Sequence, residues 1–156
     1  MRELRFEANI GASAERVFSL LADLRDYDQW LPRSSAFQGT TRISNGPIRV
    51  GTTYVEPGPL GVRHGRLTVL DEPTRLDFEQ PMTLRPPIFG VIGIRLSHTL
   101  TPAGDSVHVL RRLELTPRGP VTLAMPLVTQ AVRVENERIM KKLKAFAERG
   151  EGEQVS

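Results

Sequence analysis

Strand-like runs separated by turn-forming residues fill the middle of this 156-residue chain, and this pattern constrains its fold more than any other feature. Residues 35–115 contain no stretch of useful length with helical periodicity. Residues 4–10 alternate apolar and polar side chains, which is typical of a strand buried on one face. The expected strands are 4–10, 36–43, 48–56, 62–70, 75–80, 91–101 and 106–115. About seven strands joined by short connectors predict a curved antiparallel sheet.

Two short helices are expected after the first strand. Ser13 is a suitable N-cap for a helix over about 14–23, where apolar residues recur at helical spacing. The stretch 24–30 has aspartates that can cap a second short helix or a pair of turns, and Pro32 ends it. The sheet is therefore expected to resume only after two small helical elements.

Residues 119–149 show the periodicity of a long amphipathic helix. A helix of about thirty residues spans ~45 Å, so we expect it to lie lengthwise across the sheet. Pro126 is expected either to kink this helix or to end a separate first segment. The expected apolar stripe consists of Ala124, Val128, Ala131, Val132, Ile139, Leu143 and Phe146.

The composition favours one domain over residues 1–149, followed by a polar tail, 150–156. With 39% hydrophobic and 25% charged residues, the chain has the composition of a soluble globular protein without a transmembrane segment. It has no cysteine, which excludes disulfides, thiolate metal ligands and a cysteine nucleophile. The first residues lack the continuous apolar stretch of a signal peptide, so we expect a cytoplasmic protein.

The net charge of +3 is concentrated near the C-terminus, since residues 133–149 hold six basic and three acidic residues. Acidic residues are interspersed among the basic ones, which favours a solvated helix face and no nucleic-acid partner. Binding to a membrane surface or to a macromolecular partner through this basic face stays an alternative hypothesis.

Three segments then give the chain a resemblance to a known superfamily. They are AERVFSLLAD at 14–23, DYDQWLP at 26–32, and the helix residues around Glu135, Asn136 and Glu137 with Leu143 and Lys144. In these segments and in its order of elements, the chain resembles the START-like, birch-pollen-allergen superfamily (SRPBCC), in its polyketide cyclase/dehydrase branch. The resemblance implies an α+β helix-grip fold, in which a curved antiparallel sheet of about seven strands wraps around the long C-terminal helix.

The resemblance further implies a cavity between sheet and helix that holds a small hydrophobic molecule such as a lipid or polyketide. A low aromatic content of 6% and the small helix residues Ala124 and Ala131 favour an open cavity over a filled core. The alternative role for Trp30 is to pack the short helices onto the sheet. Glu135 and Asn136 could anchor a ligand, but a helix-to-sheet hydrogen bond explains a buried Asn136 equally well. The expected ligand-binding residues are Trp30, Tyr54, Leu96, His98, Val109, Arg111, Val128, Ala131, Val132 and Glu135.

His98 and Arg111 are the candidate catalytic residues. Each is in phase with the apolar residues of its strand, so both side chains are expected to face the cavity. Neutral His98 would accept a proton and Arg111 would stabilise developing negative charge. In the alternative, His98 only satisfies a structural hydrogen bond, and Arg111 lies near the sheet rim and extends to water.

The remaining motifs predict no metal and no cofactor. His64 lies on a strand of weak alternation and His108 is out of phase with its apolar neighbours, so the three histidines do not form a ligand set. No nucleotide-binding glycine motif or nucleophilic serine motif is present. The proline-rich loops 57–61 and 81–89 either rim a cavity entrance, contact a partner such as a second copy in a homodimer, or act as ordinary connectors.

Two functional hypotheses follow. The first is a non-covalent carrier or sensor of a small hydrophobic ligand. The alternative is a polyketide cyclase, aromatase or dehydratase that uses His98 and Arg111 for proton chemistry.

Overall fold

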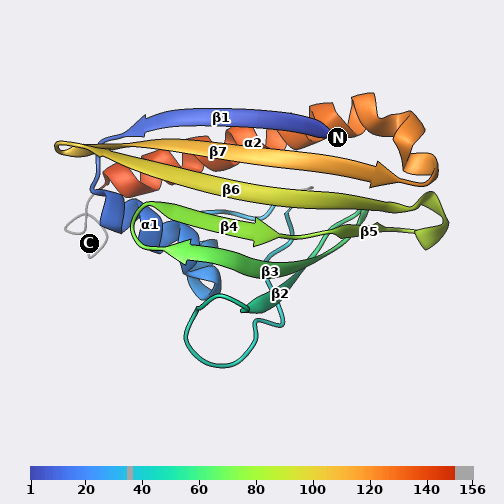
Figure 1. The fold of residues 1–156 in the computed structure, drawn as a ribbon, viewed down its shortest axis with the longest axis horizontal. Helices are drawn as coiled ribbons and strands as arrows, with labels where there is room; N and C mark the ends of the chain where they lie inside the picture. The colour runs from blue at the N-terminus through green and yellow to red at the C-terminus, as the bar shows by residue number, and fades with distance from the viewer. Residues whose placement is uncertain (35–36, 150–156) are drawn as a thin grey trace.

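The computed structural model describes residues 1–34 and 37–149 and shows a curved antiparallel sheet along one long helix (Figure 1). The strands are β1 (Arg2–Ile10), β2 (Thr53–Pro57), β3 (Gly61–Asp71), β4 (Arg75–Glu79), β5 (Met82–Leu84), β6 (Val91–Ala103) and β7 (Ser106–Arg118). Their order in the sheet is β1-β7-β6-β4-β3-β2, and β5 pairs with β3 and β6. The predicted helix-grip fold class is confirmed.

The helices after β1 and at the C-terminal end take the places that the sequence predicts, whereas the short 3₁₀ helix before β6 lies where no helix was predicted. After β1 come α1 (Ala14–Ala22) and the 3₁₀ helix η1 (Leu24–Gln29); η2 (Pro87–Phe89) precedes β6, and η3 (Pro120–Ala124) precedes α2 (Met125–Glu148). Ser13 caps α1, since its Oγ accepts a hydrogen bond from the Arg16 backbone N–H at 3.1 Å. The predicted tail, 150–156, lies outside the described residues.

Two strand predictions are wrong. The described part of the run 36–43 forms no strand, only a single bridge between Thr41 and Val55, because positive φ values at Gly39 and Arg42 break an extended conformation. Residue 36 lies outside the described residues. The predicted strand 48–56 starts only at Thr53. Conversely, β5 lies in a segment predicted to be a connector. Its three residues give too short an alternation to recognise, and prolines flank the segment at 81 and 86.

Helix α2 is shorter than predicted because Pro126 lies in its first turn. A proline is tolerated there, since the first backbone N–H groups of a helix have no intrahelical acceptor. The segment before it forms η3, so the expectation of a separate first segment is confirmed. At ~1.5 Å per residue, the 24 residues of α2 span about 36 Å.

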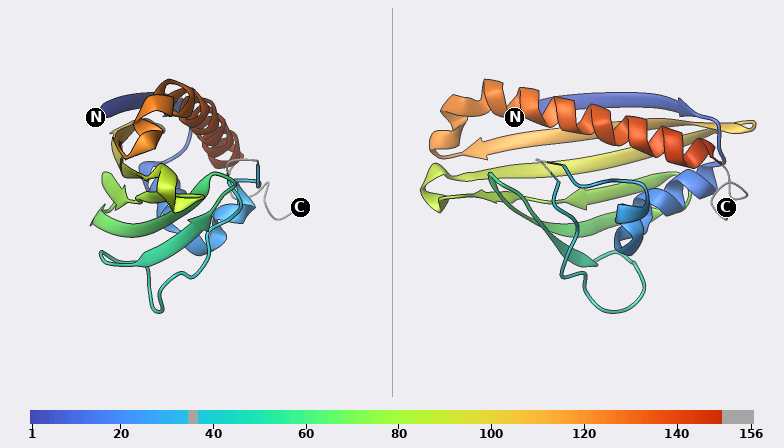
Figure 2. Two further views of the ribbon diagram at one scale, coloured as in Figure 1. Left: turned by 90° about the vertical axis from the view of Figure 1, so that its right-hand side faces the viewer. Right: turned by 180° about the vertical axis from the view of Figure 1, so that it is seen from behind.

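Most buried residues of α2 lie from its middle to its C-terminal end. Met125 is buried at the start of the helix, and Asn136, Met140, Leu143 and Ala147 are buried at spacings of three and four. The predicted stripe residues Ala124 and Ala131 are exposed. In Figure 2, α2 crosses in front of the sheet with its C-terminal end beside α1. The helix therefore packs most firmly at that end.

Hydrogen bonds reinforce this end of α2. The Arg16 guanidinium donates to the carbonyl oxygens of Ala147 at 2.9 Å and Phe146 at 3.2 Å. Glu148 accepts from the Gly11 backbone N–H at 2.7 Å, and Lys144 donates to the Asn9 carbonyl at 2.6 Å. These bonds connect the helix end to the end of β1, to the turn that follows it and to α1.

Replacing Leu143 by Ala tests this packing. Leu143 is completely buried, so we expect the free energy of unfolding to fall by ~2–5 kcal/mol, measured by urea unfolding. Leu127→Ala, on the same helix at a side chain 78% exposed, is the matched control and should change stability by less than about 0.5 kcal/mol. Equal effects of the two changes would contradict the assigned packing.

Candidate ligand-binding cavity

A cavity of about 300 Å³ lies between the N-terminal half of α2 and the inner face of the sheet. Its lining is largely apolar and includes Leu31, Phe37, Phe78, Ile94 and Leu113. The loop between β2 and β3 contributes its residues 58–60, and Gly61 at the start of β3 also lines the cavity. This loop therefore borders the cavity, which was one of the alternatives for it.

Eight of the ten predicted ligand-binding residues line this cavity. They are Trp30, Tyr54, Leu96, Arg111, Val128, Ala131, Val132 and Glu135. His98 and Val109 do not belong to the lining, although both are buried, with 1% and 0% exposure. Alternation correctly places both side chains inside the sheet, but they lie outside the part of the sheet that borders the cavity.

Arg111 lies at the centre of the polar contacts in the cavity wall. Its Nε–H donates to Asn136 Oδ1 on α2 at 2.8 Å, and its Nη1 lies 2.8 Å from His98 Nε2 on β6. Asn136 Nδ2 donates in turn to the Val132 carbonyl at 2.8 Å. With 7% exposure, Arg111 is buried and does not extend from the sheet rim to water, so that alternative is wrong.

These contacts decide the protonation state of His98. A guanidinium can only donate, so His98 Nε2 must accept and carry a lone pair. The proton is then on Nδ1, which lies 3.3 Å from the Leu76 carbonyl oxygen. Burial, followed by the charge of Arg111, lowers the pKa of His98 well below its ordinary value of 6.5. His98 is therefore a neutral acceptor that orients Arg111, as its structural alternative predicts.

Arg111 itself remains a buried cation. Burial lowers its pKa to about 10, which still leaves the guanidinium charged at neutral pH. Within residues 1–34 and 37–149, no carboxylate forms an ion pair with it. Its two hydrogen bonds use Nε and Nη1. The arrangement presents a positive charge to an apolar cavity without a directly paired anion.

A second polar contact crosses the cavity wall from β2. The Tyr54 hydroxyl donates to Gln80 Oε1 at 2.7 Å, and burial raises the pKa of this phenol well above 10. Tyr54 stands opposite Gly65 in the sheet register, and a Cβ at Gly65 would lie 2.0 Å from the tyrosine ring. Gly65 therefore accommodates the ring that lines the cavity.

Charged pairs border the cavity at two places. Glu56 binds Arg63 at 3.2 Å and accepts from the Thr40 hydroxyl at 2.8 Å. Glu135 on α2 binds Arg138 at 2.6 Å and accepts from Ser34 at 2.9 Å. Because Glu135 already binds Arg138 and Ser34, its side chain is held in place and forms a polar part of the cavity edge.

Sequence reasoning did not identify Gln80 and Glu56 as cavity residues. Each continues the inward phase of its strand, Gln80 after Leu76 and Phe78, and Glu56 after Tyr54. This phase was the available signal.

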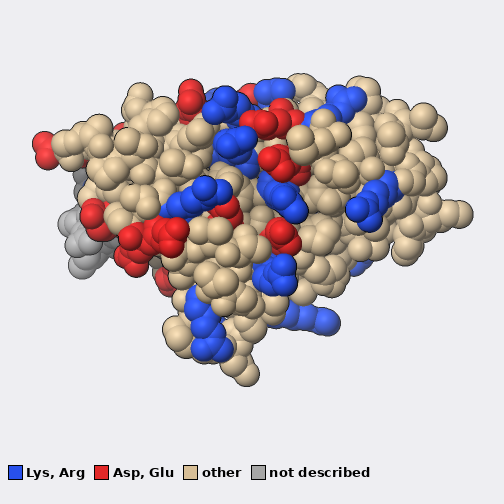
Figure 3. All heavy atoms as spheres, in the orientation of Figure 1, with Lys and Arg blue, Asp and Glu red and all other residues tan. Residues whose placement is uncertain are grey.

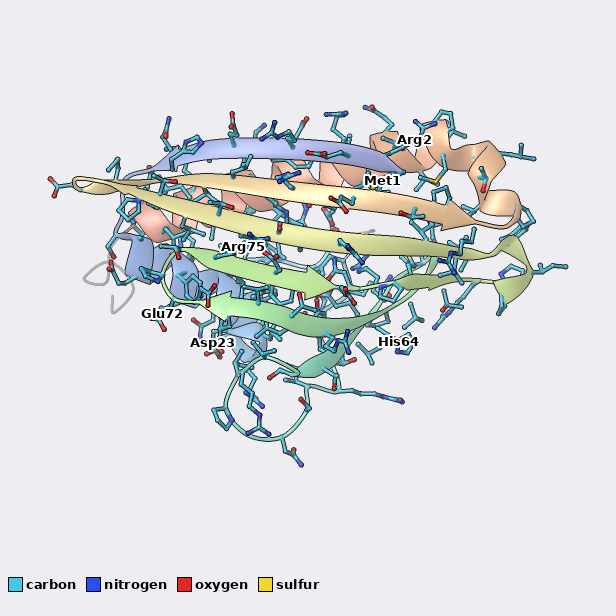
Figure 4. The ribbon with its side chains drawn as sticks, in the orientation of Figure 1. Met1, Arg2, Asp23, His64, Glu72 and Arg75 are labelled. Atoms are coloured by element: carbon cyan, nitrogen blue, oxygen red, sulfur yellow. The ribbon has the colours of Figure 1, made fainter. Side chains whose placement is uncertain are left out.

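The other two histidines lie elsewhere, since His64 is exposed on β3 (Figure 4) and His108 contacts Asn9 at 2.8 Å. The described residues contain no cluster of three or more potential metal ligands.

A sheet that grips a long helix above an apolar cavity defines the helix-grip, START-like class. The sequence matches, over residues 1–148, the model of the family described as polyketide cyclase / dehydrase and lipid transport, and the chain belongs to this family. No curated protein matches the sequence.

Solved structures share the fold at low sequence identity. The Zhui aromatase/cyclase from Streptomyces sp. R1128 matches with TM-score 0.74 and 17% identity over 95% of this chain and 94% of its own. A START superfamily protein from Mycobacterium smegmatis has TM-score 0.69 and 17% identity over 94% and 97%. A norcoclaurine synthase mutant from Thalictrum flavum has TM-score 0.69 and 16% identity over 94% and 93%. Family and fold together support a hydrophobic ligand-binding or polyketide cyclase-like role.

The neutral state of His98 predicts a specific pH dependence of stability. Below about pH 6.5 the unfolded chain binds a proton at this residue that the folded chain does not, so the free energy of unfolding decreases as pH falls. We expect His98→Gln to reduce this decrease, as measured by urea unfolding between about pH 7 and about pH 5. His64→Gln is the matched control and should keep the wild-type slope. A wild-type slope in His98→Gln would contradict the assignment.

Proposed function

We propose that the cavity binds a small apolar molecule that carries one anionic or carbonyl oxygen, and that the protein is a non-covalent carrier or sensor of this molecule. The observation that carries the proposal is the buried Arg111 guanidinium, which lines an apolar cavity and forms no ion pair with any described residue. The ligand oxygen would accept a hydrogen bond from Arg111, and the apolar body would contact the surrounding walls.

The energetics of a buried charge support this ligand class. Removing a cation from water is unfavourable unless hydrogen bonds or an opposite charge compensate it. Asn136 and His98 supply two neutral acceptors, and neither neutralises the charge. A ligand anion would do so in a site of low dielectric constant, where a charge-assisted hydrogen bond is strong.

The shape of the cavity supports a small ligand. Its volume of about 300 Å³ is at the lower end of the ~300–1,000 Å³ range of small-molecule sites. Apolar side chains from the sheet, α2 and η1 surround this volume. A compact ring system or a short chain therefore fits it better than a long lipid does.

The catalytic alternative requires a proton acceptor that reaches the ligand. His98 does not line the cavity, and its Nε2 lone pair accepts from Arg111. We therefore favour binding over a cyclase, aromatase or dehydratase reaction in which His98 moves the proton. Arg111 would polarise a ligand carbonyl in either case.

A pair of fluorescent probes tests the proposed role of Arg111. Anilinonaphthalene sulfonate carries an anionic group, and N-phenyl-1-naphthylamine is its neutral counterpart. We expect the wild type to prefer the sulfonate, and Arg111→Gln to weaken sulfonate binding by about 10- to 100-fold, since a hydrogen bond to a charged group is lost. Binding of the neutral probe should change little. Fluorescence titration measures both affinities.

The neighbouring residue supplies the control. Arg112 pairs with Glu3 at 3.1 Å and alternates with Arg111 in β7, so its side chain lies on the outer face of the sheet. Arg112→Gln should bind both probes as the wild type does. The proposal fails if Arg111→Gln weakens neither probe, or weakens both equally while the protein stays folded. Native mass spectrometry of the purified protein then identifies any co-purified ligand.

A further inference from the structure

Five large apolar side chains are exposed at one end of the molecule. Their exposed fractions are 59% for Leu60, 77% for Ile88, 51% for Phe89, 90% for Leu123 and 78% for Leu127. We refer to these five residues as the apolar tip. They come from three segments, namely the β2–β3 loop, η2, and η3 with the first turn of α2. In Figure 1, η2 and η3 both lie at the right-hand end of the sheet.

The three segments are held together by the backbone. The Arg85 N–H donates to the Leu60 carbonyl at 2.9 Å, which joins the β2–β3 loop to the segment before η2. The backbone after η2 and the backbone before η3 approach each other closely at Gly90 and Gly119. A Cβ at Gly90 would lie only 1.9 Å from the Arg118 carbonyl oxygen. Gly90 also has a φ of 109°, which favours glycine. The apolar tip is therefore a defined surface built from connected segments.

The charges around the apolar tip have one sign. The segments 57–70, 80–104 and 115–134 contain no aspartate or glutamate. Arg85, Arg118 and Arg133 are exposed there, and none of them forms an ion pair within the described part of the chain. On the face drawn in Figure 3, no acidic side chain appears at the right-hand end. Exposed apolar groups are thus combined with unpaired positive charge.

The apolar tip also adjoins the cavity. Leu60 belongs to both, and Val128, which lines the cavity, follows Leu127 directly in α2. Ala131, one turn further along the helix, is exposed and also lines the cavity. A surface covering the apolar tip would therefore lie beside the cavity entrance.

We propose that the apolar tip docks on an anionic lipid bilayer. Leu, Ile and Phe side chains would enter the headgroup region while the three arginines bind lipid phosphates. A second copy of the chain fits this surface less well, since pairing two such surfaces would bring like charges together. None of the helices in the described ranges is long and apolar enough to span a bilayer, so docking would be peripheral. The docking itself does not depend on the proposed function. Only its consequence, exchange of the ligand with the membrane, rests on that function.

Co-sedimentation with vesicles tests the proposal. We expect the wild type to bind vesicles of phosphatidylcholine with phosphatidylglycerol, to bind pure phosphatidylcholine vesicles weakly, and to dissociate at high salt. Leu123→Ser/Leu127→Ser should lower the partition coefficient by about tenfold or more. Arg85→Gln/Arg118→Gln should lower it by about fivefold for each arginine removed.

Matched controls come from the loop before β2. Val50, which is 58% exposed, is replaced by Ser, and the exposed Arg42 and Arg49 are replaced by Gln. These variants should bind vesicles as the wild type does. Urea unfolding should confirm that all variants remain folded.

Three results would overturn the proposal. They are absence of binding to anionic vesicles, binding that the tip variants do not weaken, and a dimer in light scattering that Leu123→Ser/Leu127→Ser converts to a monomer. The last result would assign the apolar tip to a second copy. The docking proposal and the ligand proposal can fail independently. The tip variants should still bind the sulfonate probe without vesicles. Arg111→Gln should still bind vesicles.

Discussion

The unequal attachment of α2 along its length determines the rest of the structure. Its C-terminal half is fixed by buried Met140, Leu143 and Ala147, and by hydrogen bonds that the Arg16 guanidinium and the Gly11 backbone N–H donate to it. Its N-terminal half carries small or half-buried residues that face the cavity. The sheet therefore packs tightly on one end of the helix and leaves open space beneath the other. One helix combines a tightly packed segment and a segment that lines the cavity.

Arg111 marks the boundary between these two parts. Through Asn136 it joins β7 to α2, and through His98 it joins β7 to β6. The same side chain lines the cavity. Its structural role and its proposed binding role are thus compatible, because they use different nitrogen atoms of one guanidinium group. His98 and Asn136 act as positioning residues in this arrangement.

The sequence predicts the fold well because alternation and helical spacing report burial directly. Period-two alternation identifies His98 and Arg111 as inward-facing, and both are buried. It does not show which buried residues line a cavity, since that depends on how the helices cover the sheet. His98 and Val109 are buried outside the cavity lining, whereas Leu96 and Arg111 belong to it. Whether a buried residue belongs to the core or to the cavity wall depends on its position along the strand. The alternation of side chains does not distinguish the two.

The pair Tyr54 and Gly65 affects the size of the cavity, whereas Arg111 supplies its positive charge. Tyr54 occupies its place because the opposite residue has no side chain. The two residues lie on β2 and β3, whereas Arg111 is held by α2 and β6. Complementary substitutions at this pair would resize the enclosed volume while leaving the cationic group in place. In the proposed function, selectivity for molecular size and selectivity for charge would therefore depend on different strands, and either could change by substitution without loss of the other.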